Sequence, residues 1–201
     1  MIPTEILEQE HGVIEIVLSS LEKMAEMALK SGAIDIDSAT EAIDFIRNFA
    51  DRCHHAKEEV HLFTMMEEKG FSKELGPIAV MLHDHNVGRA YVRAMEESVH
   101  AVSSGDEAAI HRFAENAMGY TGLLRSHIMK ENRILYPMAN QAFSDDDQLR
   151  LMEAFERVEK EEIGEGVHEK YHAIAQNLAE KYGVTSYSAD PGCELGCCSG
   201  Q

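Results

Sequence analysis

The chain has 201 residues, with 36 acidic against 18 basic side chains and a formal net charge of −18 at pH 7. A surface with this charge repels phosphate groups, so we expect neither nucleic acid nor an anionic membrane as a partner. The length favours one domain with a substantial core. Four prolines, no tryptophan and long runs rich in Ala, Glu, Leu and Met favour helices over sheets.

The N-terminal sequence and the placement of the cysteines indicate the cellular compartment of the protein. No apolar run approaches the roughly 20 residues that span a bilayer, and the start "MIPTEILEQEHG" has no secretion signal. Four cysteines, one within a predicted helix and three near the end of the chain, do not resemble a disulfide framework. We therefore expect a cytoplasmic protein.

Apolar periodicity and helix-boundary residues predict two helices in the first third of the chain. The first begins at Pro3 and runs to about residue 30. The second begins at Ser38, which with Glu41 three residues later is typical of a capping box, and it runs to Lys69.

Three further helices are predicted downstream. The third begins at Pro77 and ends near residue 103, and the fourth spans about 106–142, where Pro137 predicts a kink or an early end. The fifth follows "SDDD" and runs to about Tyr182, with Gly164 and Gly166 weakening its middle.

These elements predict an all-α protein in three parts. Long helices joined by short breaks favour an up-down-up-down four-helix bundle over residues 1–142. Residues 143–182 are predicted to be an additional C-terminal helix packed on the bundle. Residues 183–201 are predicted to be a flexible cysteine-rich tail.

The chain contains an internal repeat. "EHGV" (10–13) matches "DHNV" (84–87), and "HHAKEEVHLF" (54–63) matches "HIMKENRILY" (127–136). His54 then aligns with His127, and Glu58 aligns with Glu131, so the frame H-x3-E-x3-L-[FY] occurs twice. The repeat predicts two helical hairpins related by pseudo-twofold symmetry.

The histidines of the repeat are expected at one depth in the bundle. Residues i and i+4 share a helix face, so His54 projects beside Glu58 and His127 beside Glu131. At a rise of about 1.5 Å per residue, the histidines of each hairpin lie roughly 25–30 Å from its turn. The candidate metal ligands are His11, His54, Glu58, His85, His127 and Glu131.

The ligand chemistry favours particular metals. Four imidazoles and two carboxylates at one level of an apolar bundle need a partner. If each glutamate bridges two metals, each metal receives two nitrogens and two carboxylate oxygens, and a bridging oxide or hydroxide leaves one position open. High coordination without thiolate suits iron or manganese better than tetrahedral zinc.

The six residues resemble the ligand pattern of the hemerythrin-like (HHE cation-binding) domains, over residues 1 to about 142. The resemblance implies a four-helix bundle holding two iron ions in an oxo- or hydroxo-bridged di-iron centre, with manganese or zinc as substitutes. The chain departs from oxygen-carrying hemerythrin, whose third helix has two histidines four residues apart. Here the positions four residues before and four residues after His85 are Met81 and Arg89, and Glu131 replaces an Asp. The set of four His and two Glu resembles the branch associated with oxygen or nitric oxide sensing, iron-centre repair and peroxide chemistry.

Neighbouring groups could extend this set. His55 and Glu59 are each one residue from a candidate ligand, and we expect them in solvent or just outside the ligands, although a one-residue register shift would make them the ligands. We expect His61 in the core or beside the ligands. Tyr91 and Tyr120 either line the pocket or belong to the ordinary core.

Two other groups of residues could bind a metal. One candidate second site lies on the fifth helix, without an evident partner helix, and comprises Glu165, His168, Glu169 and His172. Cys53 is expected to be an inert buried thiol. A soft-metal or disulfide-exchange role is open for the tail residues Cys193, Cys197 and Cys198.

Three functions are compatible with the sequence. The first is a binding or sensing module for a small-molecule ligand, O2, NO or H2O2, at the open iron position. The second is a di-iron oxidoreductase with peroxidase, catalase-like or NO reductase activity. The third is a protein that stores or donates iron. The sequence defines neither the choice among them nor the oligomeric state.

Overall fold

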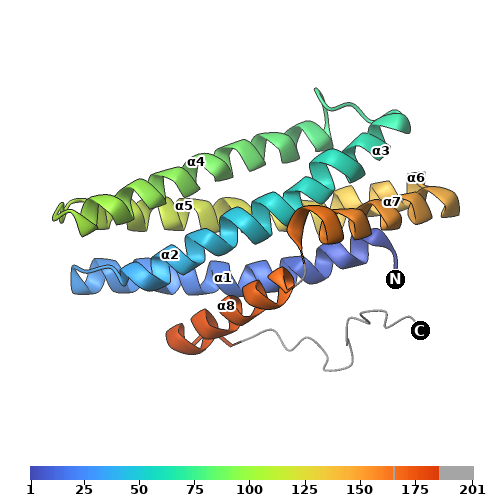
Figure 1. Cartoon of the computed structure of the whole chain (residues 1–201). Coiled ribbons are helices and arrows are strands. Elements are labelled where there is room, and N and C mark those ends of the chain that lie inside the picture. The colour runs from blue at the N-terminus through green and yellow to red at the C-terminus, as the bar shows by residue number, and fades with distance from the viewer. Residues whose placement is uncertain (165, 186–201) are drawn as a thin grey trace, which may run out of the picture.

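A computed structural model describes residues 1–164 and 166–185. The described residues are helical apart from short connections, and no strand occurs among them. Four long helical rods lie side by side, and two shorter helices from the C-terminal part lie against them (Figure 1). The predicted all-α class and a helical bundle are confirmed.

Each of the four rods corresponds to one predicted bundle helix. Two are single helices, α1 (Pro3–Ser31) and α4 (Pro77–Ser103). The other two each pass through π-helical segments. The second rod comprises α2 (Ile36–Phe45), η1 (Ile46–His55), η2 (Lys57–Leu62) and α3 (Phe63–Glu68), and the fourth comprises α5 (Ala109–Lys130), η3 (Glu131–Leu135) and α6 (Tyr136–Ala142).

The N-cap of the second rod lies three residues before the predicted N-cap. Asp35 is its N-cap, and the Asp35 carboxylate accepts a hydrogen bond from the backbone N–H of Ser38 at 3.2 Å. Ser38 therefore lies inside the first turn, and the predicted capping box at Ser38 was wrong. Aspartate caps a helix as well as serine does, because its carboxylate accepts a hydrogen bond from a backbone N–H of the first turn.

The fourth rod continues through Pro137 to Ala142, so the early end predicted at this proline does not occur. The π-helical segment η3 immediately precedes it, with the N–H of Tyr136 bonded to the carbonyl of Glu131. Pro137 then lies in the first turn of α6, where its missing N–H removes no necessary hydrogen bond.

The predicted fifth helix is two helices, so that prediction was wrong. They are α7 (Asp145–Arg157), continued by the π-helical η4 (Val158–Ile163), and α8 (Val167–Tyr182). Gly164 and Gly166 have φ of 95° and 79°, outside the helical region, so they interrupt the helix instead of merely weakening it. α7 contacts α1 and η2, whereas α8 contacts α1 and α2. The boundary between bundle and appended segment stays a prediction, and residues 186–201, with their cysteines, lie outside the described residues.

The buried side chains form two apolar clusters with a polar layer between them. One cluster includes Phe45, Phe49 and Phe113, and the other includes Phe63 and Met81. Along each rod the polar residues fall near the junction of the two clusters. The layer contains the buried side chains of His11, His54, Glu58, His85, His127 and Glu131.

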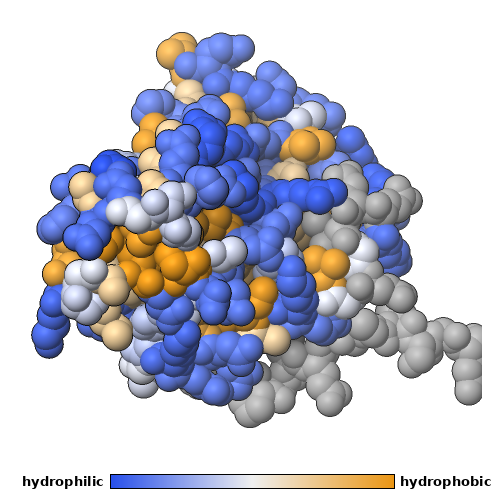
Figure 2. Space-filling view, turned by 60° about the vertical axis from the view of Figure 1, so that its left-hand side comes forward, coloured by the Kyte–Doolittle hydropathy of each residue, from blue (hydrophilic) through white to orange (hydrophobic). Residues whose placement is uncertain are grey.

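Figure 2 shows one face of the molecule, which is covered mostly by hydrophilic residues, with hydrophobic residues gathered in smaller patches. Scattered exposed apolar side chains are normal for a folded domain. Within residues 1–164 and 166–185, no helix is both long enough and apolar enough to cross a membrane.

Gly119 and Gly122 of α5 provide a matched test of the α4–α5 packing. A Cβ at Gly119 would lie 2.6 Å from Cε1 of Tyr91 in α4, whereas one at Gly122 would meet nothing within 4 Å. Gly119→Ala should lower the free energy of unfolding by about 1–3 kcal/mol through overpacking. Gly122→Ala should raise it by about 0.5–1 kcal/mol, because alanine favours the helix. Urea unfolding measures both, and equal stability of the two variants would contradict this packing.

Candidate metal centre

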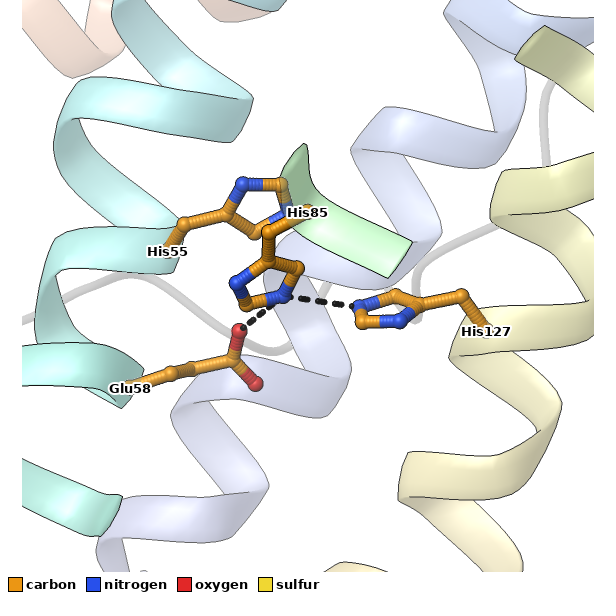
Figure 3. Close-up of side chains that lie close together, drawn as sticks. All are labelled: His55, Glu58, His85 and His127. Atoms are coloured by element: carbon orange, nitrogen blue, oxygen red, sulfur yellow. Dashed lines mark hydrogen bonds and ion pairs between the residues drawn. The ribbon is translucent and has the colours of Figure 1, made fainter. Parts of the chain in front are cut away.

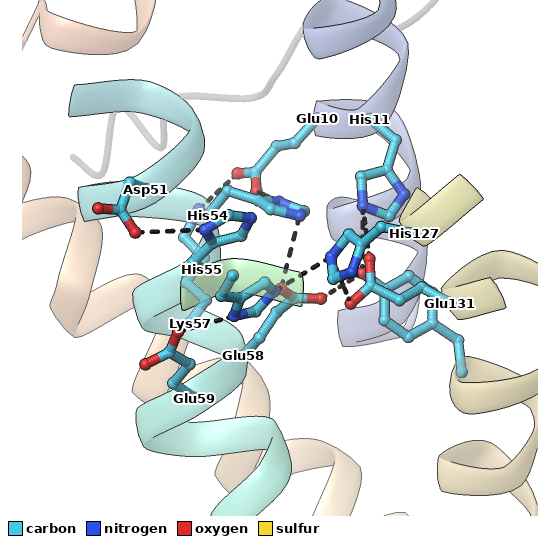
Figure 4. Close-up of polar contacts among 12 residues, drawn as sticks. Glu10, His11, Asp51, His54, His55, Lys57, Glu58, Glu59, His127 and Glu131 are labelled. Carbon is cyan, nitrogen blue, oxygen red and sulfur yellow. Dashed lines mark hydrogen bonds and ion pairs between the residues drawn. The ribbon is translucent and has the colours of Figure 1, made fainter. Parts of the chain in front are cut away.

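One group of potential ligands comes from three rods of the bundle. It contains His11 of α1, His54 of η1, Glu58 of η2 and Glu131 of η3, whose ligand atoms all lie within 4.8 Å of one another. The His11 Nε2 lies 3.3 Å from Glu131 Oε2, and the His54 Nε2 lies 3.8 Å from Glu58 Oε2. Figure 4 shows these side chains pointing toward one another. All four are buried.

A second group lies beside the first and shares Glu58 with it. It contains His55, Glu58, His85 and His127 (Figure 3). The Nε2 atoms of His85 and His127 are 3.1 Å apart, and His85 Nε2 lies 3.5 Å from Glu58 Oε2. Glu131 reaches this group too, because its Oε1 lies 3.1 Å from His127 Nε2. Both glutamates are therefore positioned between the two groups.

The two shared carboxylates have oxygens that lie near imidazole nitrogens without forming a hydrogen bond to them. Glu58 Oε2 and both oxygens of Glu131 are buried without a hydrogen-bond partner among the described residues. Burying a carboxylate without a partner costs several kcal/mol. Cations held by imidazole nitrogens and carboxylate oxygens satisfy such atoms, and this donor set without thiolate fits iron or manganese. The residues present therefore fit a pair of metal ions.

The partly π-helical backbone explains why adjacent histidines face the same site. Hydrogen bonds from i to i+5 place more residues in each turn, so consecutive side chains are separated by a smaller angle. His54 and His55 end η1, and both are buried. The ring of His55 stacks on that of His85 at 3.7 Å with an interplanar angle of 16°. His55 was expected in solvent or outside the ligands, and instead it belongs to the second group.

The Nδ1 atoms of His54 and His127 face acidic residues. Each of these acidic residues directly precedes a different histidine of the repeat. His54 Nδ1 lies 2.9 Å from Glu10 Oε2, and His127 Nδ1 lies 3.6 Å from Asp84 Oδ2. Glu10 directly precedes His11, and Asp84 directly precedes His85. The acidic residue in each "acidic-His-x-Val" motif thus orients the histidine of the following rod, directing its Nε2 inward.

The Nδ1 atoms of the other two histidines, His85 and His11, face residues that directly follow the shared glutamates in the sequence. His85 Nδ1 lies 2.7 Å from Glu59 Oε1, and His11 Nδ1 lies 2.8 Å from Asn132 Oδ1. Glu59 follows Glu58, and Asn132 follows Glu131. Glu59 is therefore just outside the ligand set, as expected. A carboxylate faces His85 where a neutral amide faces His11, so the two halves of the centre differ electrostatically.

Lysines complete the repeated pattern. Lys57 Nζ lies 2.5 Å from Glu10 Oε1, and Lys130 Nζ lies 2.5 Å from Asp84 Oδ2. Both lysines directly precede a shared glutamate, so the repeat extends to H-x2-K-E. Sequence reasoning missed these lysines and the orienting role of Glu10 and Asp84, although each pair is visible in the aligned motifs.

Tyr136 was also missed as a site residue. It is fully buried, its hydroxyl donates to Glu58 Oε1 at 2.7 Å, and it lies 3.4 Å from His11 Nε2. The first half of the repeat has Phe63 at the matching position. The sequence contained one signal for this role: the aligned position holds a phenylalanine in the first half of the repeat and a tyrosine in the second.

The buried glutamates and His127 have displaced pKa values. Burial and the neighbouring Glu131 charge raise the pKa of Glu58 well above its ordinary value. Burial opposes ionisation of Glu131, but His127 and His11 hold the pKa of Glu131 well below its ordinary value. Burial likewise opposes the charged form of His127, and Glu131 and Asp84 raise its pKa to about 9. At neutral pH Glu58 and His127 therefore retain protons that a metal must displace.

A third polar group lies beside the centre, where α8 meets the bundle. His168 of α8 approaches Glu159 of η4, with His168 Nε2 3.0 Å from Glu159 Oε2, and lies 3.5 Å from Cys53 Sγ. Lys57 Nζ pairs with both Glu10 and Glu159. Burial would lower the pKa of Lys57, but these carboxylates raise it above its ordinary value. The ammonium therefore supplies the cation that the carboxylates need.

This group bears on the second metal site predicted on the fifth helix. His168 does find partners on the bundle, which the sequence did not predict. Glu169 and His172 are exposed, and Glu165 lies outside the described residues. Cys53 is buried, and burial raises the pKa of its thiol, as expected for an inert cysteine.

The remaining candidate residues belong to neither of the two ligand groups. His61 packs against Phe155 of α7, with ring centroids 6.5 Å apart. Tyr91 packs against Gly119, whereas Tyr120 lines a cavity beside the second group. Of the two tyrosines considered as pocket residues, only Tyr120 lines this cavity.

Comparisons with known proteins agree with this geometry. The model of the hemerythrin HHE cation-binding domain matches residues 2–139. Uncharacterized proteins of Mycobacterium bovis and of two strains of Mycobacterium tuberculosis are each 22% identical over 184 residues, covering 92% of this chain and 71% of the relative. No solved structure was found to match this chain.

Replacing either shared carboxylate should prevent binding of a metal pair. Glu58→Ala or Glu131→Ala removes the oxygens that both ligand groups share, so stoichiometric binding of two metals per chain should be lost. Elemental analysis after loading and desalting measures this, with circular dichroism to verify folding. Glu115→Ala, at an exposed glutamate of α5, is the control. Retention of both metals by either centre variant would refute the shared-ligand arrangement.

Metal loading should release protons, and the effect should depend on pH. Below about pH 9 the metal-free protein holds a proton on His127, and the raised pKa of Glu58 keeps a second one in place. We expect release of about one to two protons per chain at pH 7, fewer above pH 9, and an affinity that rises with pH. An indicator dye in weak buffer, with Co2+ as the added metal, measures the release. Loading at pH 7 without proton release would contradict the assigned protonation.

Proposed function

Because the chain belongs to the hemerythrin HHE cation-binding family, we propose that it holds two iron ions and binds or senses O2, NO or H2O2 at this pair. His11 and His54 would hold one ion, and His85 and His127, with His55 beside them, would hold the other. Glu58 and Glu131 would bridge the pair. The four rods would form the up-down-up-down bundle expected of this family.

The observation that carries this proposal is the position of the two glutamates. Each has an oxygen within 3.5 Å of an imidazole Nε2 in the second group, and Glu131 has another at 3.3 Å from His11. Three of their four oxygens lack a hydrogen-bond partner among the described residues. Carboxylates that lie between two sets of imidazoles favour a pair of metals over a single ion.

When bound, an iron pair supplies reversible redox chemistry and open positions for small oxygen- or nitrogen-containing ligands. The chain itself orients and encloses the site. Hydrogen bonds to the Nδ1 atoms of His11, His54 and His85 orient these rings with Nε2 facing inward. At His127, Asp84 lies 3.6 Å from Nδ1. Tyr136 donates its hydroxyl proton in a hydrogen bond to Glu58, and the apolar clusters on both sides exclude water.

A di-iron oxidoreductase is the second candidate, favoured by a cavity that reaches His55 and His85 from the outside. Such a route suits repeated entry and exit of a substrate. Storage or donation of iron is less well supported. The ligands are buried and held by hydrogen bonds, an arrangement that favours retention of the metal.

Iron content and reactivity test these functions. Protein from iron-replete cells should contain two irons per chain, whereas one zinc or no metal would contradict the proposal. Anaerobically reconstituted protein is then mixed separately with O2, NO and H2O2. A stable adduct spectrum supports binding or sensing, and multiple turnovers support an oxidoreductase. Rapid transfer of iron to a chelator would instead support iron donation.

A further inference from the structure

A cavity of about 190 Å³ opens between the second, third and fourth rods, beside the second ligand group. His55 and His85 form part of its wall, and both are buried. The inner wall is otherwise mainly apolar, with Ile46 from η1, Val92 from α4 and Leu124 from α5. A molecule in this cavity lies next to a face of the candidate metal centre.

The size of the cavity exceeds what a diatomic ligand needs. Water occupies roughly 30 Å³ in the liquid, and an engineered protein cavity of about 150 Å³ accommodates benzene. The space beside His85 is therefore large enough for a molecule with one aromatic ring or a short branched chain. O2, NO or H2O2 would leave most of it to water.

The rim of the cavity carries three arginines, Arg47, Arg89 and Arg93. Arg47 pairs with Glu96, and Arg89 pairs with Asp51, with its Nη2 2.7 Å from Asp51 Oδ1. Arg93 is exposed, and no ion pair is formed by it within the described part of the chain. Of the three rim arginines, Arg93 is therefore the one whose guanidinium is open to an added anion.

The two acidic residues of the cavity wall do not cancel this charge at Arg93. Asp51 is bound to Arg89, and Asp84 is bound to Lys130 at 2.5 Å. Each aspartate thus has a cationic partner, although Arg89 also pairs with Glu59. An anion entering the cavity meets the free guanidinium of Arg93 without facing an unpaired carboxylate.

Tyr120 provides a polar group deeper in the cavity. Its side chain is 2% exposed and lines the wall, yet its hydroxyl has no hydrogen-bond partner among the described residues. The hydroxyl can therefore donate a hydrogen bond to, or accept one from, a molecule in the cavity. Gly88 lies opposite, and a Cβ there would be 3.5 Å from the Tyr120 ring, so the absence of a side chain keeps this region open.

We propose that this cavity binds a small organic monocarboxylate of about the size of benzoate. Arg93 binds the carboxylate at the rim, and Ile46, Val92 and Leu124 contact the apolar body. Tyr120 hydrogen-bonds a second polar group at the inner end, which lies toward His55 and His85. The approach of this inner end to iron rests on the proposed function, whereas binding of the carboxylate does not.

Calorimetric titration of the full chain, with its metal content measured, tests the proposal with three probes. Benzoate should bind, and 4-hydroxybenzoate should bind more tightly because its hydroxyl can pair with Tyr120. Benzyl alcohol, which lacks the charge, should bind at least about tenfold more weakly than benzoate. Benzoate affinity should fall about tenfold in Arg93→Gln, and the advantage of 4-hydroxybenzoate should disappear in Tyr120→Phe.

Arg112→Gln is the matched control, because Arg112 is exposed on α5 and does not line the cavity. It should leave benzoate binding unchanged, whereas Gly88→Leu should abolish binding by filling the space. Failure of benzoate to bind at millimolar concentration, or equal affinity in Arg93→Gln and Arg112→Gln, would overturn the proposal. So would equal competition by chloride, which would indicate only general attraction of anions.

These outcomes separate the cavity from the metal centre. A chain that holds two irons and does not bind benzoate retains the proposed function and loses the carboxylate site. A chain that binds benzoate through Arg93 but takes up no iron retains the cavity proposal and loses the di-iron function.

Discussion

Two glutamates, Glu58 and Glu131, lie fully buried among four imidazoles at the centre of the bundle, and this constraint organises the surrounding structure. Their charges oppose each other, and burial penalises both. A protein can tolerate such a pair if cations bind between the carboxylates and if the imidazoles are fixed in the ligating orientation. The residues around them meet the second requirement directly.

The orientation is achieved by a pattern that the pseudo-twofold repeat uses twice. Acidic residues beside His11 and His85 face His54 and His127, while residues after the two glutamates face His85 and His11. Each ligand is therefore held by a neighbour of another ligand. Displacement of one rod would disturb ligands on two, so the position of the helices and the geometry of the centre are coupled.

The two halves of the centre are not equivalent, despite the repeat. Lys57 is buried beside Glu10 and Glu159, whereas Lys130 is partly exposed beside Asp84. The half containing His85 also has the extra imidazole of His55 and borders the cavity. The half containing His11 has the phenol of Tyr136. This asymmetry supports entry of a ligand on the side of His85.

The sequence predicted the helical class, the four rods and the six side chains that meet, because the repeat places the same residue types at matching depth. It could not predict the π-helical segments, since the shift to i→i+5 hydrogen bonds depends on packing around the site. The sequence therefore left open whether His55 lies in solvent, just outside the ligands or among them, and the structure places it, buried, in the second group. The break at Gly164 was also missed, because a glycine within a helical pattern can be either tolerated or used at positive φ. The partners of His168 depend on how α8 folds back on the bundle, which local periodicity does not encode.

The central claim is that Glu58 and Glu131 hold two irons between the two groups of imidazoles. X-ray absorption at the iron edge of the anaerobically reconstituted protein tests it most directly. The account predicts nitrogen and oxygen ligation with an iron–iron scattering path at roughly 3.5–4 Å. A spectrum with no iron–iron path, or with sulfur among the ligands, would contradict it.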